Sequence, residues 1–295
     1  LTCTTEMNQP GLLLIRGLGH SGSTILDLAL GAHPQLIGLG EAVRVLERPR
    51  LGEEHKGPQQ LRGDLRFERR CTCGELAGDC PVWGPLLAWL PAHDDCPLAE
   101  KFNRLIEPLT ATSPCWLVES FQADEQLLEA QALGRPVRVI QLTRDVRSWV
   151  HSESRRGVER HGRGGNVGWR SMLRWWRINR RWEQRLNRSG CAVFRLGYEE
   201  LALAPEQALR QLCAWLEVGF DPAMLQPGLN SSSHIVSGNR MRFDPGQSQA
   251  IRYDAAWLSS AALSLRVAPL LPAVARLNRR LVYSNGLLGR VWPSA

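Results

Sequence analysis

A run of glycines and hydroxyl residues near the start of the chain has the composition of a phosphate-binding loop. The run is Gly17-Leu-Gly-His-Ser-Gly-Ser-Thr24, and it separates an apolar stretch from a helical one. Glycines let the backbone turn so that successive N–H groups face one phosphate. The N-terminus of the following helix adds N–H donors and a partial positive charge. The residues that we predict to bind a phosphorylated ligand are His20, Ser21, Gly22, Ser23 and Thr24.

The loop lacks one residue on which nucleoside triphosphatases depend. Its spacing matches the pattern G-x4-G-K-[ST], but Ser23 stands at the lysine position. In nucleoside triphosphatases that lysine contacts the β- and γ-phosphates. The loop therefore disfavours hydrolysis of ATP or GTP and favours a donor whose transferred group carries less negative charge.

The elements that must position this loop indicate the α/β class. Short apolar runs predict strands, and periodic runs that end at Gly or Pro predict helices. The strands are expected at 11–16, 115–119, 137–142 and 191–196, and the helices at 24–30, 124–133, from about 146 onward, and at 205–216. Strands that alternate with helices imply a parallel sheet that binds ligands at its carboxyl ends. We expect a P-loop-like three-layer fold with a central parallel sheet of about four to five strands flanked by helices.

We expect residues 1–295 to form a single domain with one irregular insertion. Residues of about 48 to 100 are rich in Pro, Gly and charge, which is typical of loops. Three cysteines lie close together there: Cys71, Cys73 and Cys80. A structural zinc site would need a fourth ligand, for which the candidates are Cys96, His93 and His55. A local disulfide and reduced thiols are the alternatives.

The loop and the residues that follow it resemble the PAPS-dependent sulfotransferases, in particular their bacterial and tyrosylprotein branches. The common loop of that family is [KR]-S-G-[ST]-[ST], and the matching stretch here is His20-Ser-Gly-Ser-Thr24. The similarity continues through Leu30-Gly-Ala-His-Pro34 to Gly40-Glu41. One departure is His20, which replaces a lysine or arginine that helps to carry the charge of the sulfate.

The resemblance implies the reaction and its cofactor. The donor would be 3′-phosphoadenosine 5′-phosphosulfate (PAPS) and the product adenosine 3′,5′-bisphosphate. A sulfuryl group would pass by in-line displacement to a hydroxyl or amine of a small-molecule acceptor. No metal is assigned to this reaction.

A second family signature implies a site for the 3′-phosphate of the nucleotide. It consists of an arginine at a strand end and a serine eight residues later, which Arg144 and Ser152 match. An arginine offers a planar fork of donors to phosphate, and a hydroxyl about two helical turns along can reach the same group. Tyr198 resembles a tyrosine that touches the nucleotide, with plain packing as the alternative. Residues 232–240 resemble a late loop that folds over the cofactor, with Gly238, Asn239 and Arg240 as the residues of the site.

Sulfuryl transfer benefits from a general base, because the acceptor hydroxyl loses its proton as the new bond forms. Glu41 is the first candidate, since the tyrosylprotein branch has a glutamate at a similar place. A structural partner for an arginine is the alternative role of Glu41. His33 is the second candidate for the base, although a His-Pro pair is more typical of a turn. His20 is expected to stabilise developing negative charge.

The basic residues are concentrated in one segment of the chain. The net charge is +7, and residues 151–190 hold 11 Arg against 3 Glu. Six arginines there recur every three or four residues and share one helix face: Arg170, Arg174, Arg177, Arg181, Arg185 and Arg188. The opposite face is mostly apolar and should pack into the core; it carries Met172, Trp175, Asn179, Trp182 and Leu186. The arginine stripe is either a solvated face or a surface that attracts an acidic or membrane-associated acceptor.

Composition leaves two other classes of function open. Hydrophobic residues at 43% and charged residues at 22% are typical of a soluble globular protein, for which we expect a cytoplasmic location. The alternative enzyme is a nucleotide or small-molecule kinase with a degenerate phosphate loop, which would need magnesium and ATP. The alternative without catalysis is a basic module that binds nucleic acid or membrane, which would leave both phosphate signatures unexplained. We therefore expect no nucleic-acid partner.

Overall fold

A computed structural model of the chain describes residues 10–47, 69–112, 114–122, 134–161, 167–260 and 262–287. Its centre is a five-stranded parallel sheet flanked by helices, with the strand order β2-β3-β1-β4-β5. The strands are β1 (Gly11–Gly17), β2 (Leu36–Gly38), β3 (Trp116–Glu119), β4 (Val137–Thr143) and β5 (Ala192–Gly197). The predicted class of fold is confirmed.

The register of the sheet explains why β1 is apolar throughout. Leu12 of β1 lies opposite Leu117 of β3, and Leu13 lies opposite Val118. All seven residues of β1 are buried. A strand that is covered on both faces needs a continuous apolar run, and the sequence of β1 supplies one.

Most of the predicted elements are present, with bounds that shift by one or two residues. The helix expected at 205–216 is α11 (Pro205–Leu216). The helix expected at 124–133 lies outside the described residues. The insertion expected to be irregular contains a helix, α5 (Trp83–Trp89), because its apolar residues pack together: Trp83, Leu86 and Leu87 are all buried.

The contacts within the chain divide it into two compact units. The first unit is built from Leu1–Ile15, Thr24–Arg138 and Leu216–Ala250, and the second from Arg16–Ser23, Val139–Trp215 and Ile251–Ala295. The first α-helix, α1 (Ser23–Gly31), begins at the point where the chain passes from the second unit back to the first.

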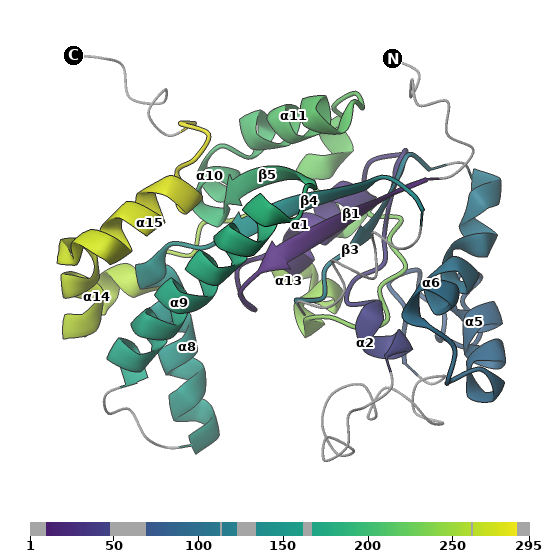
Figure 1. Cartoon of the computed structure of the whole chain (residues 1–295), viewed down its shortest axis with the longest axis horizontal. Coiled ribbons are helices and arrows are strands. Elements are labelled where there is room, and N and C mark those ends of the chain that lie inside the picture. The colour runs from purple at the N-terminus through teal and green to yellow at the C-terminus, as the bar shows by residue number, and fades with distance from the viewer. Residues whose placement is uncertain are drawn as a thin grey trace. The chain divides into compact units, whose positions relative to one another are not determined.

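Besides α1, the helices that the structure describes in the first unit are mostly short. They are α2 (Val43–Leu46), α5, α6 (Leu98–Ile106), α12 (Pro227–Asn230) and α13 (Pro245–Ser248), with 3-10 turns at Leu90–Ala92, Glu107–Thr112, Pro222–Leu225 and Arg240–Phe243. Helices α5 and α6 pack against each other (Figure 1). The described part of the 48–100 segment is therefore not wholly irregular.

The two longest of the described helices belong to the second unit, together with four shorter ones. They are α8 (Val146–His161), α9 (Val167–Arg188), α10 (Tyr198–Leu203), α11, α14 (Leu263–Val267) and α15 (Pro272–Val282), with 3-10 turns at Ala256–Ser259 and Ala268–Leu270. Helices α8 and α9 run side by side (Figure 1). Their shared core contains Trp149 and Trp175, which pack with Leu281 of α15.

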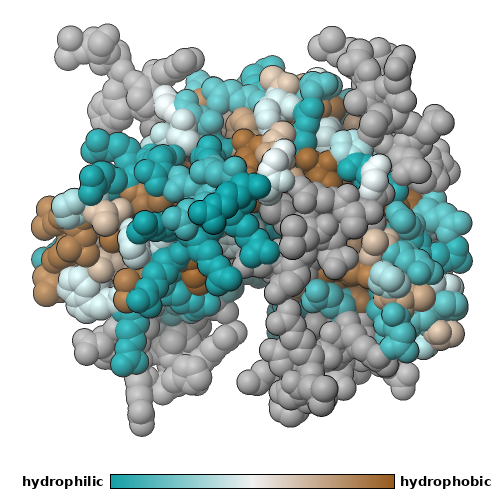
Figure 2. Space-filling view, in the orientation of Figure 1, coloured by the Kyte–Doolittle hydropathy of each residue, from teal (hydrophilic) through white to brown (hydrophobic). Residues whose placement is uncertain are grey.

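Helix α9 has the two faces that the sequence predicts. The five residues of the predicted inner face, Met172, Trp175, Asn179, Trp182 and Leu186, are all buried. The arginines of the stripe are exposed, apart from Arg185, which is half-buried. Figure 2 shows them as a hydrophilic band along α9. Among the described residues, no helix combines the length and the apolarity that crossing a bilayer requires.

The end of β5 makes a close approach to the end of α15, which gives the first prediction. A Cβ atom at Gly197 would lie 1.7 Å from the carbonyl oxygen of Val282. We expect Gly197→Ala to lower the free energy of unfolding by about 1–3 kcal/mol, because the backbone must move to admit the methyl group. Denaturant unfolding measures the change. Gly219→Ala is the matched control, since nothing lies within 4 Å of its Cβ. Equal stabilities of the two variants would contradict the close approach.

Candidate functional site

The phosphate loop joins β1 to α1 and contains two residues in the left-handed region. His20 has φ 68° and Gly22 has φ 94°. Left-handed residues that alternate with right-handed ones turn successive backbone N–H groups toward one side, as in loops that bind anions. The N–H of Ser21 donates to the carbonyl oxygen of Leu18 at 3.2 Å and closes the turn. Arg16 is fully buried in β1, so a permanent positive charge stands just before the loop in the chain.

Tyr198, the first residue of α10, lies against this loop. A Cβ atom at position 22 would be 2.3 Å from Cδ2 of the Tyr198 ring, so only glycine fits there. The Tyr198 hydroxyl donates to the carbonyl oxygen of Arg252 at 2.8 Å, which fixes the ring. The loop conformation and the tyrosine therefore depend on each other.

Arg144 lies just after β4 and links four parts of the second unit. Its Nη1 donates to the carbonyl oxygen of His20 at 3.2 Å, and its Nε donates to the hydroxyl of Ser148 at 2.7 Å. Its guanidinium also lies over the Tyr198 ring, with 5.3 Å between Cζ and the ring centroid. The side chain is only 9% exposed. The structure thus brings together the phosphate loop, Arg144 and Tyr198.

Arg144 has one partner that the sequence did not indicate. Its Nη2 forms an ion pair with the Asp254 carboxylate at 2.6 Å. Partial burial by itself raises the pKa of Asp254, but the Ala256 N–H and the Arg144 guanidinium outweigh it and hold the pKa below its ordinary value. The Asp254 carboxylate is therefore charged at neutral pH. It occupies N–H donors of the Arg144 guanidinium, and such donors also bind phosphate oxygens.

Ser152, the predicted companion of Arg144, lies one helical turn beyond the serine that Arg144 contacts. Both serines are on α8, where Ser148 is buried and Ser152 is half-buried. The Nε of Arg144 donates to Ser148, whereas Nη1 donates to His20 and Nη2 to Asp254. The role of Ser152 stays a prediction.

Two buried acidic residues, Asp145 and Glu199, lie next to each other near Arg144. Asp145 accepts hydrogen bonds from Arg147, from Asn278 at 2.9 Å and from the Tyr283 hydroxyl at 3.0 Å. The Asp145 N–H donates to the Glu199 carboxyl at 2.8 Å. Burial, helped by the nearby Asp145 charge, raises the pKa of Glu199 to about 8. Glu199 is therefore largely protonated at neutral pH, which limits the negative charge around Arg144.

In the first unit, Glu41 follows a turn that Asp27 holds in place. Asp27 lies on α1 and accepts a hydrogen bond from the Gly40 N–H at 3.1 Å. Gly40 has φ 66°, and the Glu41 N–H donates to the carbonyl oxygen of Ser237 at 2.9 Å. Complete burial raises the pKa of Asp27 to about 8, and the Glu119 and Glu41 carboxylates add to the shift against a hydrogen bond from Ser120. Asp27 is a positioning residue that the sequence analysis missed.

The two candidates for the general base have different surroundings. Glu41 forms an ion pair with Arg44, whose Nη1 lies 3.0 Å from Oε2, and the Glu41 side chain is 24% exposed. His33 is buried, and both of its ring nitrogens are engaged: Nδ1 accepts from the Gln35 N–H at 3.0 Å, and Nε2 lies 2.6 Å from the carbonyl oxygen of Gly219. His33 therefore shapes the turn that follows α1, as a His-Pro pair does.

The late loop is held by an arginine that the sequence did not single out. Arg242 donates to the carbonyl oxygens of Val236, Gly238 and Asn239 at 2.7–2.9 Å. Burial lowers the pKa of Arg242 to about 10, and the nearby positive charge of Arg69 adds to the shift. Asn239 and Arg240 are exposed. The loop therefore has a fixed backbone and presents polar side chains to solvent.

Comparison with known proteins gives one sequence relative of note. Protein-tyrosine sulfotransferase 2 of Gallus gallus is 24% identical over 249 residues, which cover 81% of this chain and 62% of the relative. The chain thus spans less than two thirds of that protein. No family model matches the chain.

Two solved structures that superimpose on this chain are sulfotransferase domains. The sulfotransferase domain from the curacin biosynthetic pathway superimposes with a TM-score of 0.56 and 22% identity, covering 92% of this chain and 98% of that domain. The domain from the Synechococcus PCC 7002 olefin synthase gives 0.51 and 20%, with coverage of 93% and 95%. The chain has the sulfotransferase fold. The resemblance to sulfotransferases that the loop motifs predict is confirmed.

The raised pKa of Glu199 predicts how stability depends on pH. Its folded pKa of about 8 exceeds the ordinary value of 4.5, so the folded state holds a proton that the unfolded state has lost. The stability that this proton provides is complete below pH 4.5 and is lost as the pH rises to about 8, with a slope of at most about 1.4 kcal/mol per pH unit. Glu199→Gln should make the decline shallower in urea unfolding at pH 5 to 8.

The exposed Glu206→Gln variant on α11 is the control and should keep the wild-type slope. A Glu199→Gln slope equal to that of the wild type would contradict the raised pKa of Glu199, because only the difference between the two slopes isolates this carboxyl.

Proposed function

We propose that this chain is a PAPS-dependent sulfotransferase that moves a sulfuryl group to a hydroxyl or amine of a small-molecule acceptor. The observation that carries the proposal is the meeting of the two motif segments within one unit. Arg144 donates to the carbonyl oxygen of His20, and Tyr198 packs on Gly22. A nucleotide with phosphates at both ends of its ribose needs two phosphate-binding segments at close range.

The loop from His20 to Thr24 is proposed to hold the 5′-phosphosulfate. The left-handed residues of the loop and the start of the nine-residue helix α1 support this role, because both present backbone N–H groups to an anion. Ser23 replaces the lysine that a triphosphate would need. His20 is proposed to stabilise the negative charge that develops on the sulfuryl oxygens.

Arg144 and Ser152 are proposed to bind the 3′-phosphate, and Gly238, Asn239 and Arg240 to cover the nucleotide. The guanidinium of Arg144 is fixed by its contacts before any ligand arrives, so binding loses little side-chain entropy. A phosphate at Arg144 would share or displace the Asp254 carboxylate. That competition makes Asp254 a second determinant of nucleotide affinity.

Glu41 is proposed as the general base. PAPS supplies the sulfuryl group, and the acceptor must lose a proton as the bond to sulfur forms. The Glu41 backbone is fixed by Ser237 and the Gly40 turn, and its partly exposed carboxylate can accept a proton. The ion pair with Arg44 supports the alternative structural role and would have to loosen during the reaction.

Two observations bear on the nature of the acceptor. The curated relative is named for protein tyrosine, an acceptor with a phenolic hydroxyl. The arginine stripe on α9 would raise the local concentration of an acidic acceptor or favour an anionic membrane surface. A phenol is therefore a reasonable first probe of transfer.

Nucleotide preference distinguishes this proposal from a kinase. We expect adenosine 3′,5′-bisphosphate to raise the Tm more than ATP or AMP at equal concentration. Arg144→Ala should weaken bisphosphate binding about 10- to 100-fold, because it removes a charged hydrogen-bonding partner of about 1.5–3 kcal/mol. Thermal shift and isothermal titration calorimetry measure both effects.

The exposed Arg177→Ala variant on α9 is the matched control and should bind the bisphosphate as the wild type does. Each variant is compared with its own unliganded Tm, so a loss of stability does not count as a loss of binding. Equal stabilisation by ATP and magnesium would favour the kinase. Steeply salt-dependent binding of nucleic acid without nucleotide preference would favour the basic module.

The role of Glu41 can be tested separately from binding. We expect Glu41→Gln to lower kcat for sulfuryl transfer to a phenolic probe by about 10²- to 10⁴-fold, which is the range for loss of a general base. Bisphosphate affinity should not change. Transfer is followed by mass spectrometry of the sulfated phenol. The exposed Glu206→Gln variant is the control, and an unchanged kcat for Glu41→Gln would leave Glu41 only its structural role.

A further inference from the structure

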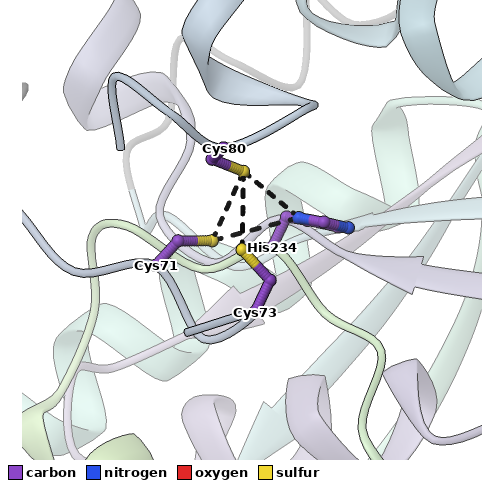
Figure 3. A group of neighbouring side chains, drawn as sticks. All are labelled: Cys71, Cys73, Cys80 and His234. Carbon is purple, nitrogen blue, oxygen red and sulfur yellow. Dashed lines mark hydrogen bonds between the residues drawn. The ribbon is translucent and has the colours of Figure 1, made fainter. Parts of the chain in front are cut away.

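Four side chains that can bind a metal meet in the first unit. They are Cys71, Cys73, Cys80 and His234, and their ligand atoms all lie within 4.8 Å of one another. Figure 3 shows the three sulfurs and the imidazole nitrogen Nδ1 facing a common centre. The three cysteines are close in sequence, whereas His234 comes from the late loop, more than 150 residues further along.

The fourth member corrects an expectation from the sequence. His93 stacks on Trp89, with 4.1 Å between the ring centroids, and its Nδ1 lies 2.9 Å from the carbonyl oxygen of Trp89. Cys96 lines a separate cavity with Lys101. The third candidate, His55, lies outside the described residues. Within the described part of the chain, His234 is the residue that completes the cluster.

The spacing of the four atoms fits a tetrahedral site and does not fit a disulfide. Two zinc-bound sulfurs at about 2.3 Å from the metal are roughly 3.8 Å apart in a tetrahedron. Here Sγ of Cys80 lies 3.7 Å from Sγ of Cys71 and 3.8 Å from Sγ of Cys73. Nδ1 of His234 lies 3.3 Å from Sγ of Cys80 and 4.0 Å from Sγ of Cys71. A disulfide would need about 2.05 Å between two sulfurs.

A tight hairpin presents the first two cysteines. Arg70 and Leu76 form an antiparallel bridge, and the Cys71 N–H donates to the carbonyl oxygen of Glu75 at 2.9 Å. Gly74 closes the turn with φ 100°. Cys80 then stands just before α5, where its carbonyl oxygen accepts from the Gly84 N–H at 2.7 Å. The backbone therefore fixes all three sulfurs.

Backbone N–H groups lie against the three sulfurs. The Cys73 N–H donates to the Cys71 sulfur, and the Glu75 N–H donates to the Cys73 sulfur. The Cys80 sulfur accepts from the N–H groups of Val82 and Trp83. Hydrogen bonds of this kind orient side chains that bind a metal.

His234 is oriented by contacts on both sides of its backbone. Its N–H donates to the carbonyl oxygen of Gly38 at 2.7 Å, and its carbonyl oxygen accepts from Trp83 Nε1 at 2.6 Å. Thr72, between the first two cysteines, donates its hydroxyl to Ser233 and accepts from the Ile235 N–H. Thr72 of the hairpin therefore bonds to the residues immediately before and after His234 in the late loop.

We propose that Cys71, Cys73, Cys80 and His234 bind one zinc ion. Three thiolates and one imidazole in a tetrahedral arrangement form a ligand set typical of structural zinc. Four protein ligands leave no open position for substrate, so the role is structural. The ion fastens the cysteine hairpin to the loop that continues into Gly238, Asn239 and Arg240.

Metal content tests the site directly. The whole chain is expressed with zinc in the medium, purified without a metal-affinity step and assayed by inductively coupled plasma mass spectrometry. We expect about one zinc per chain. Cys73→Ser removes the exposed ligand, so it should lose the zinc with little disturbance of packing. Cys96→Ser is the matched control from the same segment and should retain the zinc.

Cobalt substitution tests the geometry without relying on any variant. Replacing zinc with Co²⁺ should give the strong visible absorption of a tetrahedral site and a sulfur-to-cobalt charge-transfer band in the near ultraviolet. Chelation should abolish both and lower the Tm, because structural zinc contributes to folding free energy. These measurements need no nucleotide, so they are independent of the proposed sulfuryl transfer.

Three results would overturn the proposal. The first is wild-type protein that contains no zinc and gives no cobalt spectrum. The second is a disulfide among the three cysteines, detected by mass spectrometry of the freshly purified chain. The third is a Cys73→Ser variant that retains a full equivalent of zinc.

Discussion

The guanidinium of Arg144 is the interaction on which the candidate site depends. It lies just after β4, donates to the carbonyl oxygen of His20 and stacks over Tyr198. Tyr198 in turn presses on Gly22, where a larger residue would not fit. One cation thus fixes the end of a strand, a phosphate loop and the start of a helix.

The charges around this cation are balanced by protonation as well as by pairing. Asp254 and Asp145 remain ionised because each has a cationic or hydrogen-bonding partner. Glu199, which is buried beside Asp145, has its pKa raised to about 8. The protonation that follows from the burial of Glu199 therefore reduces the negative charge close to Arg144.

The sequence predicts features whose determinants are close together in the chain. The inner face of α9 is correct residue by residue, because a helical period places Trp175 and Trp182 on one side whatever they pack against. The phosphate loop is recognisable because its glycines are required by the backbone conformation of the loop itself. In contrast, Asp254 meets Arg144 across 110 residues, and no local pattern marks such a pair. His234 was missed as a member of the cysteine cluster for the same reason. The three residues of β2 are too few to show a period.

Each of the two compact units is assembled from three separate stretches of chain, and the boundary between them falls inside β1 and again inside β4. No single cut can release either unit intact. A fragment that contains one unit in full must therefore also contain parts of the other. Folding must also wait for contacts between distant segments, which slows the search in proteins dominated by non-local pairing. Point substitutions, which leave both units complete, are therefore better suited than truncations to separating the roles of the two units.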